Sequence, residues 1–245
     1  PSMKAVLSYY PLDYTQLKYK DTHVPFMCKC SFNNDNMLSF EAALIEKTDE
    51  LKQIPFLAAG MFFTTRSGLQ VTAVTVENSW DRFEKVAKHE AFHQFAHSRF
   101  SNGMPQWLNE GIADYFKYSP YINGAIIAGQ VDRTTLRLAQ KDIQDNWYIP
   151  ITELLRMSNS TWNMRLKGSN PSLQYRQSWS MVHFLVHGDG GMHARNFDQY
   201  LLKIAGGMDD EKAFLEAFGT TDLQAFERSW INHVTNLKPS STLTA

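Results

Sequence analysis

Two histidines and a glutamate are the residues of this sequence best suited to chemistry. His89, Glu90 and His93 form the pattern H-E-x-x-H. If this segment is helical, the spacing of four residues puts both imidazoles on one face, one turn apart. Two neutral imidazoles can then bind one zinc ion, with Glu90 beside the metal to take a proton from its water. The same pattern also occurs on solvated helices, so the flanking residues must decide between the two interpretations.

The flanking residues have the periodicity of a helix. Asn78-Ser79 offers a cap, and apolar side chains then recur at near-helical spacing without Gly or Pro: Trp80, Phe83, Val86, Ala87, Phe92, Phe95 and Ala96. A break follows at residues 101–105, and a second helix is expected from Gln106. This helix carries Glu110, far enough from His93 for a loop and a returning antiparallel helix. Two histidines, one carboxylate and water make a tetrahedral site with an open position.

The two segments together resemble a known family. H-E-A-F-H at 89–93 and P-Q-W-L-N-E-G-I-A-D-Y-F at 105–116 look like the gluzincin zinc metallopeptidases. They are most similar to the bacterial peptidase MA-like group, in which a W-L-x-E-G-x-A-x-Y-F helix supplies the third ligand. The resemblance extends less specifically over about residues 55–237. It implies that His89, His93 and Glu110 are zinc ligands and that Glu90 is the general base.

The resemblance also implies supporting residues. Asp114 lies one turn after Glu110, where gluzincins place an Asp that holds a zinc-binding histidine, and Asn109 is a second candidate for such support. A later helix commonly supplies a Tyr or His that donates to the oxyanion, and the candidates here are Tyr175 and His183. For Asp114 the structural alternative is an ordinary surface acid. For Tyr175 it is a packed aromatic ring, and for His183 a core histidine whose hydrogen bonds are satisfied.

The other histidines and the two cysteines are not expected to form metal sites. His97 continues the spacing of four residues, but one straight helix cannot easily wrap three stacked ligands around one ion. Three later histidines lack a carboxylate or cysteine at ligand spacing: His183, His187 and His193. The two cysteines, Cys28 and Cys30, are expected to be free thiols, because a disulfide closing so small a ring is strained.

Composition excludes several classes of partner. The 245 residues carry a net charge of −1, with 43% hydrophobic and 20% charged residues. No basic stretch stands out, so neither nucleic acid nor anionic lipid is an expected partner. No apolar run approaches the roughly 20 residues that cross a bilayer. The expected partner is a peptide or protein substrate; oligomeric state and location are left open, although the resemblance favours an extracytoplasmic location, secreted or periplasmic.

Strand patterns come before the metal motif and helix patterns after it. Residues 1–32 alternate like short strands, 39–54 have the spacing of an amphipathic helix, and 57–65 with 69–76 form a predicted hairpin. In gluzincins the strand before the zinc helix is a sheet edge that pairs with an extended peptide, which suits peptide recognition. The alternative is a hairpin that only covers the core. A linker or lid is expected at 158–172, among helices at 134–141, 151–157, 175–187, 195–205, 209–217 and 222–237.

These patterns predict an α+β, zincin-like fold, with a small N-terminal sheet packed on the zinc-binding helix and a mostly helical C-terminal lobe. One domain spans 1–237, with lobes of about 1–100 and 101–237, and a disordered tail follows at 238–245. The predicted function is hydrolysis of a peptide bond with Zn2+, a zinc-activated water and a Glu general base. The alternative is a catalytically silent zincin-like binding module for a peptide or glycan.

Overall fold

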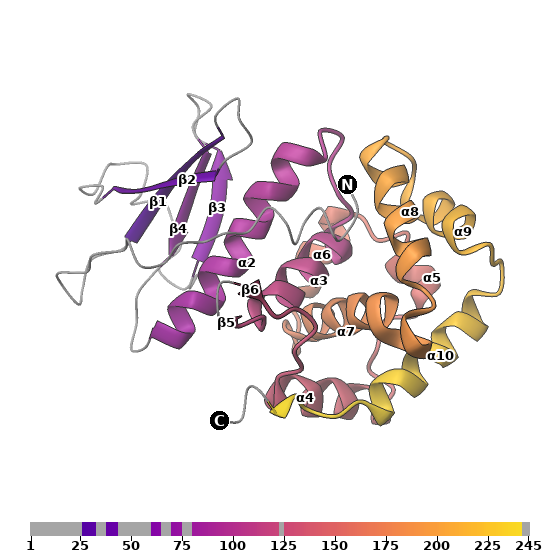
Figure 1. Ribbon diagram of the computed structural model, residues 1–245. Coiled ribbons are helices and arrows are strands. Elements are labelled where there is room, and N and C mark those ends of the chain that lie inside the picture. Colours follow the sequence, from indigo (N-terminus) through magenta and orange to yellow (C-terminus); the bar gives the residue numbers. More distant parts are fainter. Residues whose placement is uncertain are drawn as a thin grey trace. The chain divides into compact units, whose positions relative to one another are not determined.

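The structure is a computed structural model that describes residues 26–32, 38–43, 60–64, 70–74, 80–122 and 125–241. The chain divides into two compact units, Ser8–Phe95 and Ala96–Ala245, with Pro1–Leu7 belonging to the second. The division falls inside one long helix, α2 (Trp80–Arg99). Four described strands precede α2, and the other described helices follow it (Figure 1). No helix within these stretches is both long enough and apolar enough to cross a bilayer.

The four strands before α2 pair in the order β2-β1-β4-β3, and every pair is antiparallel. They are β1 (Phe26–Phe32), β2 (Leu38–Ala43), β3 (Gly60–Thr64) and β4 (Gln70–Val74). The predicted hairpin is present, since β3 pairs with β4 and Gly60 lies opposite Val74. The strand that directly precedes α2 is β4, which has a partner on both sides. The expectation that this strand forms a sheet edge is therefore wrong.

The helix predicted for residues 39–54 is also wrong where the structure describes that segment. Leu38–Ala43 is strand β2 and pairs with β1, with Phe40 opposite Cys30. Over a strand of only six residues, the apolar side chains fit the period of two of a strand as well as the period of a helix. Pairing with a neighbouring strand decides between the two periods. Residues 44–54 lie outside the described part of the chain, as do 1–25.

The α+β class predicted from the sequence is corrected by the structure, because most described residues are helical. The strands before α2 are four segments of five to seven residues. Beyond Gly60 and Phe62 their side chains lie outside the described residues, and the contact that the described part shows between these strands and the metal-motif helix is at Gly60, beside Val86 and Glu90. The buried core described here is built from helix faces, and four of its largest side chains are Trp107, Trp162, Trp179 and Trp230.

Helix α2 is amphipathic along the motif segment. Its buried side chains include Phe83, Phe92 and Phe95, whereas His97 near its end is exposed. Ion pairs of the (i, i+4) type join Asp81 to Lys85 and Glu84 to Lys88, a spacing that stabilises helices. The helix predicted from periodicity is thus confirmed, while the cap expected at 78–79 lies outside the described residues.

The unit after α2 is organised around helix α7 (Leu173–His187), whose Trp179, Val182 and Phe184 are completely buried. Helices α3, α4, α8 and α10 all contact it (Figure 1). The elements of this unit are α3 (Gln106–Lys117), β5 (Tyr121–Ile122), β6 (Ala125–Ile126), α4 (Arg133–Gln144), α5 (Ile151–Leu154), α6 (Asn159–Arg165), α7, the 3-10 turn η3 (Gly188–Gly191), α8 (Ala194–Ala205), α9 (Asp210–Phe218) and α10 (Leu223–Asn236).

Two segments expected to be irregular are ordered by specific contacts. The predicted linker at 158–172 contains helix α6, which Ser158 caps through Thr161 N and which buries Trp162 in the core. The predicted disordered tail is held at Ser240, whose N–H donates to Val131 O at 3.0 Å. Its hydroxyl also accepts from Val131 N at 2.9 Å. The predicted domain extent of 1–237, with lobes that meet near residue 100, stays a prediction.

Helices α3 and α7 approach each other closely at Gly111. A Cβ atom added to Gly111 would lie 2.6 Å from the backbone oxygen of Ser178 and 2.9 Å from Val182 Cγ2. Real Cβ atoms do not come so near, and a backbone carbonyl cannot rotate away as a side chain can. Glycine at this position therefore sets the distance between the helix that carries Glu110 and the central helix α7.

We expect Gly111→Ala to lower the free energy of unfolding by about 1 kcal/mol or more. Overpacking costs about 1–3 kcal/mol, and contact with a rigid backbone carbonyl puts Gly111 in the upper part of this range, whereas the better helix propensity of alanine returns only about 1 kcal/mol. Gly206→Ala is the matched control, because that residue has a negative φ and its added Cβ would meet only ordinary contacts at 3.4 and 3.5 Å. Urea denaturation measures both. Equal stabilities for Gly111→Ala and wild type would contradict the packing argument.

A buried carboxyl group ties α3 to α8 and α9. Asp210 accepts a hydrogen bond from Trp107 Nε1 at 2.8 Å and another from the Tyr200 hydroxyl. Both donors belong to buried residues. Burial raises the pKa of Asp210 to about 7, even though the two hydrogen bonds favour its charged form. The carboxyl group is therefore largely protonated below neutral pH in the folded protein.

This raised pKa predicts a stability change with a definite sign. The pKa of Asp210 in the folded protein exceeds the unfolded value of about 3.9. Its contribution to the free energy of unfolding is therefore fully present below pH ~4 and is lost as pH rises through 7. Asp210→Asn should remove this component, so that its unfolding free energy falls less between pH 4 and 7 than that of wild type. Tyr200→Phe should extend the loss to higher pH, because it removes a donor to the carboxylate. Parallel pH profiles for Asp210→Asn and wild type would refute this assignment.

Candidate metal centre

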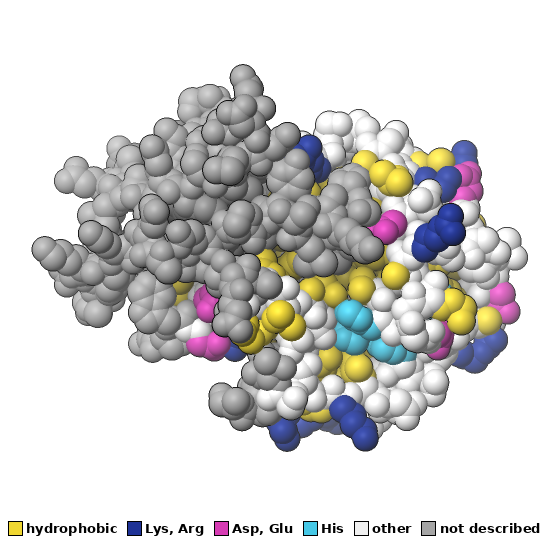
Figure 2. Space-filling model, in the orientation of Figure 1, with side chains coloured by type: hydrophobic (Ala, Val, Ile, Leu, Met, Phe, Trp, Pro, Cys, Tyr) yellow, Lys and Arg dark blue, Asp and Glu magenta, His cyan; other side chains and the backbone are white. Residues whose placement is uncertain are grey.

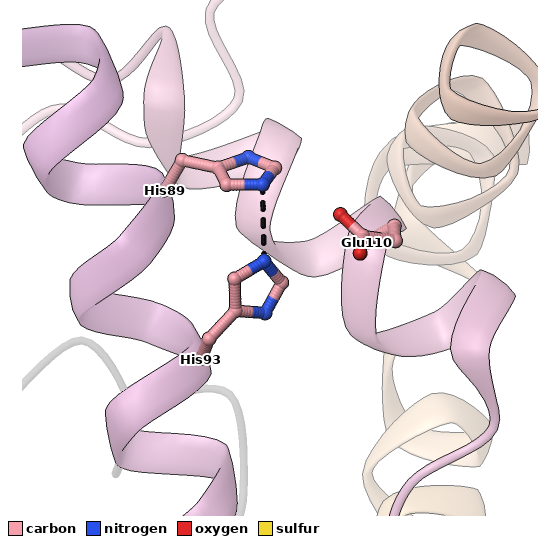
Figure 3. A group of neighbouring side chains, drawn as sticks. All are labelled: His89, His93 and Glu110. Atoms are coloured by element: carbon pink, nitrogen blue, oxygen red, sulfur yellow. Dashed lines mark hydrogen bonds between the residues drawn. The ribbon is translucent and has the colours of Figure 1, made fainter. Parts of the chain in front are cut away.

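The two motif histidines lie together on α2. Their Nε2 atoms are 3.0 Å apart, and their rings meet edge to face with centroids 4.7 Å apart (Figure 3). Both side chains are half-buried. The spacing of four residues therefore does bring the two imidazoles together on one face, as the sequence predicted.

Glu110 of α3 completes a group of three possible ligands. One ligand atom each from His89, His93 and Glu110 lies within 4.8 Å of the other two, and Figure 3 shows the carboxylate directed toward the imidazoles. It is the one group of three or more His, Cys, Asp or Glu with this proximity in the described part of the chain. The structure thus brings together the three residues predicted as ligands.

This donor set fits zinc. Zinc binds imidazole nitrogen and carboxylate oxygen at about 2.0–2.2 Å, so ligand atoms around a tetrahedral ion lie about 3.3–3.6 Å apart. The present ligand atoms, from 3.0 Å to within 4.8 Å of one another, bracket that range. Two imidazoles and one carboxylate also leave a fourth position open, as in catalytic zinc sites.

Glu90 is buried beside the backbone of Gly60. A Cβ at Gly60 would lie 2.8 Å from Glu90 Cγ, 3.1 Å from Glu90 Oε1 and 2.4 Å from Val86 Cγ1. Only glycine allows the chain to pass so close to the glutamate. The sequence identified Glu90 as a candidate base but gave no sign that Gly60 shields it.

Asp114 is buried and faces a lysine of its own helix. Lys117 Nζ donates to Asp114 Oδ1 at 3.2 Å. Burial opposes the charge of Lys117, but Asp114, with smaller contributions from Tyr118 and Glu110, outweighs burial, and the pKa of Lys117 is raised. Asp114 thus neutralises a half-buried cation. Its expected support of a zinc-binding histidine stays a prediction, as does that of Asn109.

Tyr175 lies in the first turn of α7. Its half-buried ring meets the indole of Trp162 edge to face, with centroids 5.6 Å apart. Aromatic pairs in this arrangement stabilise packing, which is the plain structural alternative for this residue. The proposed donation of its hydroxyl to an oxyanion stays a prediction.

His183 belongs to a cluster of histidines on α7 and α10. Its Nδ1 lies 3.0 Å from His233 Nε2, and the backbone of Gly129 also hydrogen bonds the ring. The ring of His187 is 4.7 Å away between centroids, and His187 Nε2 lies 2.8 Å from the Tyr115 hydroxyl. Figure 2 shows histidine side chains (cyan) gathered on one face of the molecule.

The environment of His183 keeps its ring neutral. Burial, with smaller contributions from His187 and His233, lowers the pKa of His183 to about 3. A neutral imidazole that already has His233 and Gly129 as partners matches the alternative of a satisfied core histidine. Donation to an oxyanion, the other role predicted for His183, would require the ring to give up one of these partners.

Sequence inspection missed Gln106 as part of the site. Its Nε2 donates to Glu110 Oε1 at 2.9 Å, and the two residues are separated by one helical turn on α3. The signal was available, because a glutamine and a carboxylate four residues apart on a helix can hydrogen bond. A search for polar residues four positions from each candidate ligand would have identified Gln106.

The family comparisons place this group within a segment of unassigned function. Residues 85–201 match a family model described as protein of unknown function (DUF1570), and residues 2–74 match one described as glycosyltransferase (GlcNAc). The first match contains His89, Glu90, His93 and Glu110. Neither match covers half of the chain. No curated protein and no solved structure matches the chain.

Proposed function

We propose that this protein is a zinc-dependent peptidase of the gluzincin type, with a peptide or protein as substrate. The observation that carries the proposal is the convergence of His89, His93 and Glu110, whose ligand atoms lie within 4.8 Å of one another. Two histidines and a glutamate are the ligand set of well-known zinc peptidases. The sequence resemblance in the two motif helices supports the same reaction class.

Each residue of the group has a distinct role in this proposal. His89, His93 and Glu110 hold the zinc ion, which when bound supplies a Lewis acid that polarises the scissile carbonyl and favours ionisation of water. Glu90 takes one proton from the attacking water and delivers it to the leaving amine as the C–N bond breaks. The buried position of Glu90 beside Gly60 limits its contact with bulk water.

The competing proposal is a catalytically silent zincin-like module that binds a peptide or glycan. It needs the same ligand group but no function for Glu90. The segment that matches a glycosyltransferase model, residues 2–74, contains none of the metal-group residues and supports no separate proposal. Hydrolysis, and its dependence on Glu90, therefore separates the two possibilities.

We predict one zinc ion per chain, lost in His93→Ala because two remaining ligands bind too weakly. His97→Ala is the matched control, since His97 follows one turn later on the same helix and is exposed. Both variants and wild type are stripped with a chelator, reloaded with zinc, desalted and measured by elemental analysis. Zinc content that is unchanged in His93→Ala would remove the ligand assignment.

We predict that Glu90→Gln keeps zinc and fold but lowers the hydrolysis rate by roughly 10²–10⁴, the usual contribution of a general base. The amide is nearly isosteric with the carboxylate but accepts no proton. Zinc-loaded proteins are incubated with a peptide library, and new termini are identified by mass spectrometry. Wild-type rates in Glu90→Gln would exclude Glu90 as the base. Peptide binding without any cleavage by wild type would favour the silent module.

A further inference from the structure

We propose that Gln106 is a positioning residue that orients the Glu110 carboxylate for metal binding through one oxygen. This inference rests on the proposed metal site and adds a residue that neither the motifs nor the comparisons assign. Its basis is the hydrogen bond from Gln106 Nε2 to Glu110 Oε1, 2.9 Å long, between residues one turn apart on α3.

The backbone of α3 is fixed by a contact next to each member of this pair. Trp107, the residue after Gln106, donates to Asp210 at 2.8 Å. Gly111, the residue after Glu110, lies against the backbone of Ser178. Because the main chain is held at both points, the position of the Glu110 carboxylate depends on the three side-chain torsions of this residue. The hydrogen bond from Gln106 restricts these torsions.

A neutral donor suits a metal ligand better than a cation would. The Gln106 amide holds the carboxylate but leaves its negative charge in place to attract the metal ion. The lysine on the same helix, Lys117, is instead bonded to Asp114 one turn beyond Glu110. A lysine at position 106 would neutralise the ligand and repel the incoming ion.

The hydrogen bond also predicts how the carboxylate binds. An oxygen that accepts from Gln106 has less electron density to give to a metal, so coordination through the other oxygen is favoured. One oxygen from Glu110 and one nitrogen from each histidine leave the fourth position of a tetrahedral ion open. Partners that orient a ligand in this way typically change metal affinity by about 10–100-fold when they are removed.

The test compares zinc affinity in variants of Gln106. Gln106→Met keeps the length and helix propensity of the side chain but has no donor, so we expect zinc to bind about 10–100-fold more weakly in competition with a chromogenic chelator. Gln106→Asn keeps the amide on a chain too short to reach and should show the same loss. Gln199→Met, at an exposed position of α8, is the matched control and should bind zinc like wild type.

A spectrum separates orientation from general loosening of the fold. With Co2+ in place of zinc, the visible absorption reports ligand number and geometry, and we expect it to change in Gln106→Met while the thermal midpoint of the metal-free protein stays the same. Wild-type affinity and spectrum in both Gln106 variants would overturn the role of Gln106 and leave the metal site intact. Failure of the wild-type protein to bind zinc would instead overturn the proposed site. If Gln106→Met does not fold, Gln106→Asn decides the question.

Discussion

The close approach of α3 to α7 at Gly111 is the constraint on which the described helical unit depends. Gly111 and Glu110 are neighbours in sequence, so the residue that packs α3 and the residue offered to a metal lie in the same helical turn. A larger side chain at Gly111 would push α3 away from the Ser178 backbone. The same displacement would move the Glu110 carboxylate. Packing on one side of α3 therefore determines the geometry on the other side.

Burial shifts the pKa values of two ionisable groups in this unit in opposite directions, and each shift favours the neutral form. Burial lowers the pKa of His183 to about 3 and raises that of Asp210 to about 7. The contribution of His183 to the free energy of unfolding is present above its unfolded pKa of about 6.5 and is lost as pH falls toward 3. The contribution of Asp210 to the free energy of unfolding is instead lost as pH rises from 4 to 7. Around pH 5 the slopes of these two contributions have opposite signs.

Sequence periodicity predicted the long helices and the β3-β4 hairpin well but misassigned two shorter segments. Helix α7 was expected at 175–187 and spans Leu173–His187; α10 was expected at 222–237 and spans Leu223–Asn236. Segment 39–43 was misassigned because its five residues cannot separate a period of two from a helical period. The segment at 158–172 was misassigned because its Ser and Asn residues suggested a loop, whereas Ser158 caps α6 and Trp162 anchors it.

The sequence by itself determined the pairing of His89 with His93 and the position of Glu110 on a second helix, because helical geometry relates residues one turn apart. Only the tertiary structure decided which distant groups meet, such as Trp107 with Asp210 and His183 with His233. Such contacts join residues far apart in sequence and leave no periodic signal. Burial also comes from packing, and it shifts the pKa values of His183 and Asp210 because neighbouring helices exclude the water that stabilises their charged forms.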